Sequence, residues 1–300
     1  MNKKRIVIYV LITFILTWGM DFVYILAGGI YESKAMEFIL AFSMLIPAIS
    51  VVLTRKLTGE GFKMTGKDSM MLGIHFDNKR WLWLLAALIV PFFWMDLGTG
   101  LMFLAFPETF DPSMAEKAGL TQNMLFLLPF MLIGNGILVS FGGLGEEIGW
   151  RGYLYPKLEE EYGTVKAVIF GGIIWSVWHF PSNLLGHNFG HGYWGEPWSG
   201  FLVFTIFCIS EGVMLYFFTK KTGSVWTAGF MHAISNSVGA SGVLAVMVAG
   251  RTSGNADFRS FVPMVIQMLP LVVISIPVTV WMTREKNGKE KAGKENSEMI

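Results

Sequence analysis

The chain alternates long apolar stretches with short polar connections, and about eight of these stretches approach the length of a membrane-spanning helix. A spanning helix needs about 20 mostly apolar residues, because the hydrocarbon layer is about 30 Å thick and each helical residue rises about 1.5 Å. We therefore expect an all-α fold, a polytopic integral membrane bundle of about eight transmembrane helices. The expected spans are 6–27, 37–53, 81–106, 124–143, 165–185, 198–218, 225–249 and 261–282.

Composition supports a membrane protein and excludes a soluble globule. Hydrophobic residues make up 53% of the chain and charged residues 15%, with a mean hydropathy of +0.52. Too few polar groups remain to cover a water-facing surface. The net charge of +1 gives no indication of a nucleic-acid partner, and the single cysteine, Cys208, excludes an internal disulfide. We expect one transmembrane domain over 1–283 and a flexible cytoplasmic tail over 284–300.

The first apolar stretch follows Lys3, Lys4 and Arg5, an arrangement shared by signal peptides and by first spans. The stretch is long for a signal-peptide core, and the residues near its end, Asp21 and Phe22, are not a small-residue cleavage site. We interpret it as a first span. With the amino terminus inside, the expected spans place most of the 23 basic residues on the inner side, where such residues collect. We therefore predict a multi-pass protein of the cell membrane with both termini cytoplasmic.

Ionisable side chains cost about 2.5 to 3.5 kcal/mol each at the centre of a spanning helix, so those that persist need partners or a function. The densest group includes Glu146, Glu147 and Arg151, directly after a glycine-rich stretch. In a helix, Glu147 and Arg151 share a face and can pair, whereas Glu146 points about 100° away. One carboxylate is then neutralised and the other is left as a candidate general base. The alternative is an interfacial helix end whose charges are solvated.

Two further polar groups lie on later apolar stretches. His179 is near the end of the expected span 165–185, where it is either a hydrogen-bonded core residue or a functional one. His232 and Asn236 are four residues apart on one face of the expected span 225–249. Such a pair either joins helices or stabilises an oxyanion.

Together, the pattern E-E-x-x-x-R at 146–151, an aromatic-x-x-x-H at 175–179 and H-x-x-x-N at 232–236 resembles the CPBP family. This family comprises the type II CAAX prenyl proteases and the bacterial bacteriocin-processing and self-immunity (Abi) proteins. The resemblance implies a catalytic core over about 142–240. One departure is Trp175, where eukaryotic prenyl proteases usually have phenylalanine, and we expect it to affect substrate fit more than catalysis.

The resemblance implies a CAAX-type intramembrane protease. Glu146 is then the general base for a water that His179 helps to hold, and His232 and Asn236 donate to the developing oxyanion. Glu147 belongs to the same catalytic set and, with Arg151, orders the site. Peptide hydrolysis requires a base, a bound water and oxyanion donors, which these residue types supply.

Metal dependence is open, since proteins of this family are often called metalloproteases. Two histidines and a carboxylate are a ligand set for zinc, here Glu146, His179 and His232. These residues come from three separate helices, and the H-E-x-x-H motif is absent. We favour a metal-free mechanism, with a divalent metal such as zinc as the alternative.

Other polar residues have simpler interpretations. We expect His187 and His191 to lie in a solvated outer loop. Asp21, Asp96 and Glu211 either line a polar pathway or cap and bridge helices, and we favour the second interpretation. Straight upright spans also keep Glu146 and His179 apart, so we expect the fourth segment to be tilted or to break at its glycines, or the fifth to start below the bilayer.

The predicted function is an intramembrane endopeptidase that opens toward the cytoplasmic leaflet and cuts a membrane-associated, lipidated or leader peptide. Its expected partners are the lipid bilayer and a peptide or membrane-protein substrate, with no nucleic acid. The first alternative is a non-catalytic bacteriocin self-immunity or scaffolding membrane protein. The second is a transporter that uses Asp96 and Glu211 as an ion path.

Overall fold

The computed structural model describes residues 2–66, 68–248 and 261–298. Over these ranges the secondary structure is helical, with no β-strand. The helices are α1 Asn2–Leu26, α2 Lys34–Ser43, α3 Ile46–Thr58, α4 Arg80–Ala105, η1 Pro107–Thr109, α5 Ser113–Lys117, α6 Gln122–Gly149, η2 Trp150–Leu154, α7 Tyr155–Tyr162, α8 Thr164–Trp178, α9 Phe180–Leu184, α10 Trp198–Thr222, α11 Val225–Ser241, η3 Ala245–Met247 and α12 Val262–Glu298.

The predicted polytopic helix bundle is confirmed. Seven helical segments are long and apolar enough to cross a membrane, and α8, with 15 residues, is a shorter apolar helix. The expected span 165–185 was too long, because the helix breaks at His179 between α8 and α9. The expected span 225–249 corresponds to the spanning segment Val225–Met247, in which α11 ends at Ser241 and is followed by η3, whereas residue 249 lies outside the described residues. The spanning segments are Asn2–Leu26, Lys34–Thr58, Arg80–Ala105, Gln122–Tyr162, Trp198–Thr222, Val225–Met247 and Val262–Gly288.

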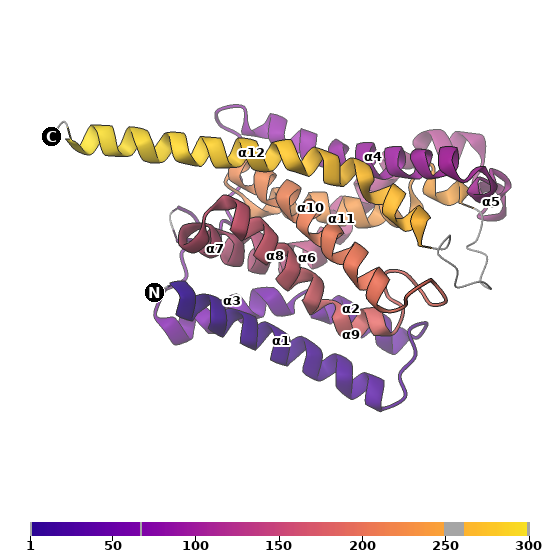
Figure 1. Cartoon of the computed structure of the whole chain (residues 1–300), viewed down its shortest axis with the longest axis horizontal. Helices are drawn as coiled ribbons and strands as arrows, with labels where there is room; N and C mark the ends of the chain where they lie inside the picture. The colour runs from indigo at the N-terminus through magenta and orange to yellow at the C-terminus, as the bar shows by residue number, and fades with distance from the viewer. Residues whose placement is uncertain (1, 67, 249–260, 299–300) are drawn as a thin grey trace.

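The helices are arranged with the site-bearing elements in the middle of the bundle. Figure 1 shows α12 and α4 along one side and α1, α2 and α3 along the other, with α6, α8, α10 and α11 between them. The most extensive packing is between α11 and α6, between α10 and α8, and between α12 and α4. Side chains of α6, α8 and α11 are thereby buried between two outer layers.

The fourth segment does not break at its glycines, which was one of the alternatives that the sequence left open. Helix α6 is continuous from Gln122 to Gly149 and is followed by a π-helical turn, η2, and by α7. The chain then reverses at Gly163, which has a φ of +80° that favours glycine. Glu146 and His179 lie at nearly equal distances along the chain from this turn. The hairpin therefore brings the two residues to the same level without any bend in α6.

The glycines of α6 instead allow close helix packing. A Cβ atom at Gly145 would lie 2.6 Å from the Met44 carbonyl oxygen, and one at Gly143 would lie 2.9 Å from that of Gly229. No side chain fits such contacts without backbone movement. The glycines thus allow α6 to pack directly against the α2–α3 junction on one side and α11 on the other.

The start of α1 and the end of α12 lie at the same end of the bundle (Figure 1), as eight crossings require when α8 is counted with the seven longer segments. The cytoplasmic location of the termini stays a prediction. Helix α12 continues through 284–298, the stretch expected to be a flexible tail. The helix therefore passes the predicted domain boundary at residue 283 without a break, and that boundary stays a prediction. Of the basic residues used in the topology prediction, Lys67, Arg251 and Arg259 lie outside the described residues.

Candidate active site

Glu147, Arg151 and His232 form a buried charged group that joins α6 and η2 to α11. Arg151 Nη1 donates to Glu147 Oε1 at 2.8 Å, as the spacing of these residues predicted. His232 Nδ1 lies 2.9 Å from the same oxygen. A carboxylate oxygen accepts, so Nδ1 donates and only Nε2 of this ring remains for a further partner. Both side chains of the Glu147–Arg151 pair are fully buried, so Glu147 fixes the orientation of the imidazole from outside the reach of solvent.

Glu146 is held by two tryptophans. Its Oε2 atom accepts a hydrogen bond from Trp150 Nε1 at 3.1 Å and another from Trp175 Nε1 at 2.9 Å. Trp150 is on η2, one turn after Glu146, and Trp175 is on α8. The carboxylate is thus oriented through one oxygen, while Oε1 has no hydrogen-bond partner among the described residues.

The Trp175 ring also packs over the Arg151 guanidinium, the cation of the Glu147–Arg151–His232 group. The Arg151 guanidinium lies 4.0 Å from the centre of a Trp175 ring and 5.0 Å from the centre of the Tyr155 ring. Such stacking stabilises a guanidinium that has been removed from water. One indole therefore contacts both charged groups of the site, Arg151 through its face and Glu146 through its N–H.

His179 is positioned at the break between α8 and α9. Its Nδ1 atom lies 3.0 Å from the carbonyl oxygen of Trp175. Because a carbonyl oxygen only accepts, Nδ1 carries the hydrogen and Nε2 is the remaining nitrogen. The ring packs edge-to-face on Trp178 and on Phe204, with centroid distances of 4.5 and 5.0 Å. These contacts fix the imidazole on the wall of the central cavity.

The candidate residues converge on one cavity of about 480 Å³. Glu146 from α6, His179 from the end of α8, and His232 and Asn236 from α11 all line it. Glu147 and Arg151 do not line it and lie behind His232 and Trp175. Asn236 is exposed at the rim, one turn beyond the buried His232. The cavity thus holds a carboxylate, two imidazoles and an amide from three helices.

Three further residues line the cavity, against the favoured interpretation of each from the sequence. Asp21 and Glu211 line it as the alternative of a polar pathway implied, and Asp21 Oδ1 and Glu211 Oε1 are buried without a hydrogen bond among the described residues. His187 lines the cavity as well, with Nδ1 bonded to the Tyr31 hydroxyl at 2.9 Å. Burial lowers the pKa of His187 to about 4, so its ring is neutral at neutral pH.

The remaining interpretations agree with the structure. Asp96 Oδ1 accepts from the Leu244 backbone N–H at 3.4 Å and so bridges α4 to the segment after α11. His191 is in the loop before α10 and contacts Glu196 at 2.6 Å. Cys208 is buried and free, as a small core residue.

Comparison with known proteins gives an independent assignment of the region that carries these residues. Residues 122–238 match the family model described as type II CAAX prenyl endopeptidase Rce1-like. This segment is similar to the Rce1-like family. The chain is also similar to CAAX prenyl protease 2 of Methanococcus maripaludis, with 32% identity over 93 residues. That alignment spans 30% of this chain and 34% of the relative, about a third of its length. The CPBP resemblance inferred from the three motifs is confirmed.

Within the Rce1-like segment, the sequence interpretation missed the role of the two tryptophans. Trp150 is four residues after Glu146, so helical spacing alone was a signal that its indole reaches the carboxylate. Trp175 was noted only as a departure from phenylalanine that affects substrate fit. Its N–H donates to Glu146, which phenylalanine cannot do, so the departure affects the carboxylate itself.

We expect Trp175→Phe to lower the peptidase activity proposed below by about tenfold, because one charge-assisted hydrogen bond to Glu146 is lost while the ring over Arg151 remains. The measurement is the rate of peptide cleavage by the wild type and the variant in the same liposomes. Trp198→Phe, on an exposed indole at the start of α10, is the matched control and should leave the rate unchanged. An unchanged rate in Trp175→Phe would show that this hydrogen bond does not matter.

The three candidate zinc ligands of the Rce1-like segment do not form a compact cluster. Among the described residues, there is no group of three His, Cys, Asp or Glu side chains that could hold a metal ion. Glu146, His179 and His232 nevertheless line one cavity, and each keeps an atom without a hydrogen-bond partner among the described residues, since only Glu146 Oε2 and the two Nδ1 atoms are bound. A hydrogen bond at Nδ1 is compatible with metal binding through Nε2, so the metal-free mechanism stays a prediction.

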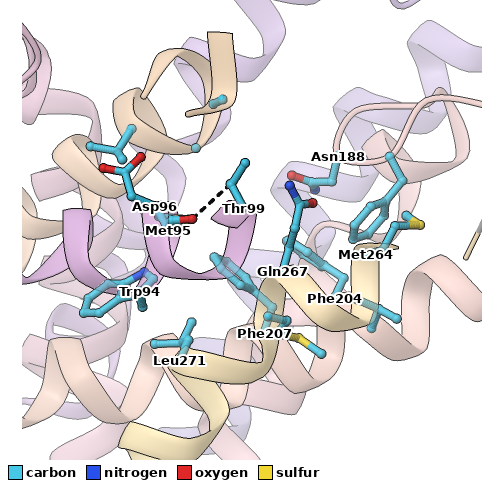
Figure 2. A pocket seen from close by; sticks show the side chains of 16 residues that line it. Trp94, Met95, Asp96, Thr99, Asn188, Phe204, Phe207, Met264, Gln267 and Leu271 are labelled. Carbon is cyan, nitrogen blue, oxygen red and sulfur yellow. Dashed lines mark hydrogen bonds between the residues drawn. The ribbon is translucent and has the colours of Figure 1, made fainter. Parts of the chain in front are cut away.

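A second, smaller cavity of about 190 Å³ adjoins the first. The two share the lining residues Met95, Asn188, Phe204, Phe207 and Gly239. Figure 2 shows its mainly apolar lining, with Asp96, Thr99, Asn188 and Gln267 as polar members. The shared residues make the smaller cavity a direct neighbour of the cavity that His179 lines.

Proposed function

We propose that this protein is an intramembrane endopeptidase that hydrolyses a peptide bond with a water activated by Glu146. One observation carries the proposal: Glu146 is anchored through Oε2 on the wall of the cavity that His179, His232 and Asn236 also line. The Rce1-like sequence of this region supports the same reaction class.

In the proposed first step, water binds between Glu146 Oε1 and His179 Nε2. Since His179 Nδ1 donates to a carbonyl, the neutral ring has a lone pair on Nε2 that accepts from the water. Glu146 takes a proton from the water as the oxygen attacks the carbonyl carbon of the peptide. This forms the C–O bond and moves the carbonyl π electrons onto oxygen.

His232 and Asn236 are the proposed oxyanion donors. His232 Nδ1 donates to Glu147, so Nε2–H is present when the ring is protonated on both nitrogens, with the Glu147 carboxylate beside it. Nε2–H and the Asn236 amide then donate to the oxyanion. The protonated Glu146 passes its proton to the leaving nitrogen, the C–N bond breaks, and an acid and an amine result. Glu147 and Arg151 are positioning residues in this scheme.

The proposed mechanism needs no metal and uses a membrane-associated peptide as substrate. The protein, in liposomes, is given lipid-anchored peptides and leader peptides, and the products are identified by mass spectrometry. We expect cleavage at an internal peptide bond, at a rate that a zinc chelator does not change. Loss of activity with the chelator and recovery on adding zinc would contradict the metal-free mechanism. Failure to cleave any peptide would favour the non-catalytic immunity or scaffolding alternative.

A further inference from the structure

Asp21 is a buried acid on the cavity wall that the proposed mechanism does not use. It lies near the end of α1 and is 3% exposed. No hydrogen bond or ion pair to it is present in the described part of the chain, and its Oδ1 atom is buried without a partner. Burying a carboxylate without a partner is unfavourable, so its retention at this position calls for a ligand.

The position of Asp21 relative to the catalytic wall is fixed by contacts between α1 and α8. Thr17 Oγ1 accepts from Trp178 Nε1 at 2.8 Å, and Trp18 Nε1 donates to the Trp178 carbonyl at 3.1 Å. Trp178 directly precedes His179. Asp21 follows Thr17 by one helical turn, about 6 Å along the axis on the same face, and both residues line the cavity. Asp21 is therefore near the catalytic wall but too displaced along α1 to replace Glu146.

The charge of the cavity lining selects the ligand class. Its acidic members are Asp21, Glu146 and Glu211, and no lysine or arginine is among the described lining residues. The Arg151 guanidinium is paired with Glu147 behind the wall, and the His232 ring, which lines the cavity, is bonded to the same carboxylate. A cationic group entering the cavity gains from the three acids, whereas a free carboxylate meets three acids balanced only by the protonated His232 ring of the proposed mechanism.

Glu211, the other acid of the cavity with a buried oxygen that accepts no hydrogen bond, differs from Asp21 in having a cation nearby. It lies on α10 beside Gly212, where a Cβ atom would come within 3.3 Å of Arg151 Nη2. The Arg151 charge is therefore close to this turn of α10. Asp21 makes no ion pair among the described residues, and the lining also includes Thr17, one turn before it on α1, with Ser182 and the neutral His187 elsewhere on the wall. Asp21 is the acid of the cavity that lacks a neighbouring cation.

We propose that Asp21 determines substrate specificity by binding a positively charged group of the peptide, an ammonium or a guanidinium. This deepens the proposed function, on which it rests, and names the substrate class: a peptide with a lysine or arginine close to the cleaved bond, or with its free amino terminus there. The ligand forms a charge-assisted hydrogen bond with the carboxylate, in a cavity where few water molecules compete.

The test uses peptides that differ only in charge. Wild type and Asp21→Asn, in liposomes, are given a cleaved peptide that carries lysine, or its neutral isostere norleucine, at each position near the scissile bond in turn. A copy of each peptide with an acetylated amino terminus distinguishes binding of a lysine side chain from binding of the free amino terminus.

We expect one lysine position, or the free amino terminus, to lower KM about tenfold relative to the neutral peptide. Asp21→Asn should remove this difference. Glu37→Gln, an exposed acid on α2, is the control and should retain it.

Binding is measured separately in the Glu146→Gln background, so that it does not depend on turnover. Tighter binding of the charged peptide, lost on adding Asp21→Asn, supports the proposal. Equal binding of charged and neutral peptides, equal loss for both in Asp21→Asn, or no binding of either overturns it. If the wild type cleaves no peptide but still binds the charged peptide more tightly, the proposed peptidase activity is wrong and the proposed cation-binding role of Asp21 is supported. A melting temperature of Asp21→Asn at or above that of the wild type shows that the variant is folded.

Discussion

Glu146→Gln should reduce kcat for peptide cleavage by about 10²- to 10⁴-fold, the range expected when a general base is removed. The substitution keeps the shape of the side chain, and the amide oxygen still accepts from Trp150 and Trp175. The amide cannot take a proton from water. The variant should therefore bind peptide and keep its fold while losing turnover.

Three comparisons make this result specific. The melting temperature of Glu146→Gln should match that of the wild type, which excludes unfolding as the cause of the lost activity. Glu37→Gln, the same substitution at an exposed position, should keep full activity. His179→Gln, at the end of α8, should lose activity as well, because the water loses its second partner. Turnover by Glu146→Gln at the wild-type rate would exclude Glu146 as the base.

Arg151→Met should destabilise the protein by about 3 to 5 kcal/mol, the cost of leaving one member of a buried ion pair without its partner. Both side chains of the Glu147–Arg151 pair are fully buried, so water cannot replace the lost cation. Methionine keeps much of the volume next to Trp175 and Tyr155. The quantity to measure is the free energy of unfolding in a fixed lipid–detergent mixture.

The double variant Glu147→Gln/Arg151→Met separates charge from packing. Removing both charges leaves no unpaired ion, and the glutamine oxygen still accepts from His232 Nδ1. We expect the double variant to recover most of the lost stability. If instead the two substitutions add, the pair is not coupled and the role of Glu147 as a shared acceptor for Arg151 and His232 is wrong.

The parts of the site that depend on one helix were predictable from the sequence. The Glu147–Arg151 pair follows from a spacing of four residues, and the direction of Glu146 follows from the helical repeat. The cross-helix partners were not predictable in this way. His232 could have faced either carboxylate, and its bond to Glu147 depends on how closely α11 approaches α6 at Gly143 and Gly229.

The relation between Glu146 and His179 shows a second limit. The expected span ended at 143, which placed Glu146 at a helix end and left His179 far above it. The apolar pattern does end there, but the helical backbone continues through η2 and α7. Buried polar side chains of this continuation have partners elsewhere in the chain, as Lys157 has in Glu60. Hydropathy identifies the span, whereas helix length beyond it depends on partners elsewhere in the chain. The turn at Gly163 then sets the level at which α8 passes Glu146.

The acids that the sequence interpretation assigned to bridging roles illustrate a third limit. Sequence position alone does not distinguish Asp96, which accepts from a backbone N–H, from Asp21 and Glu211, which face the cavity. All three are single acids in apolar helices. Their different roles follow from which neighbouring helix supplies a donor, and that information is present only in the packed bundle.

The central claim is that folding gathers Glu146, His179, His232 and Asn236 around one hydrated cavity. An electron cryomicroscopy structure of the wild type in lipid nanodiscs, at a resolution that shows ordered water, tests it most directly. We predict a water within about 3 Å of both Glu146 Oε1 and His179 Nε2, with His232 and Asn236 facing the same space. A structure in which these side chains point to separate neighbours, or in which the space between Glu146 and His179 excludes water, would show that they do not form one hydrolytic site.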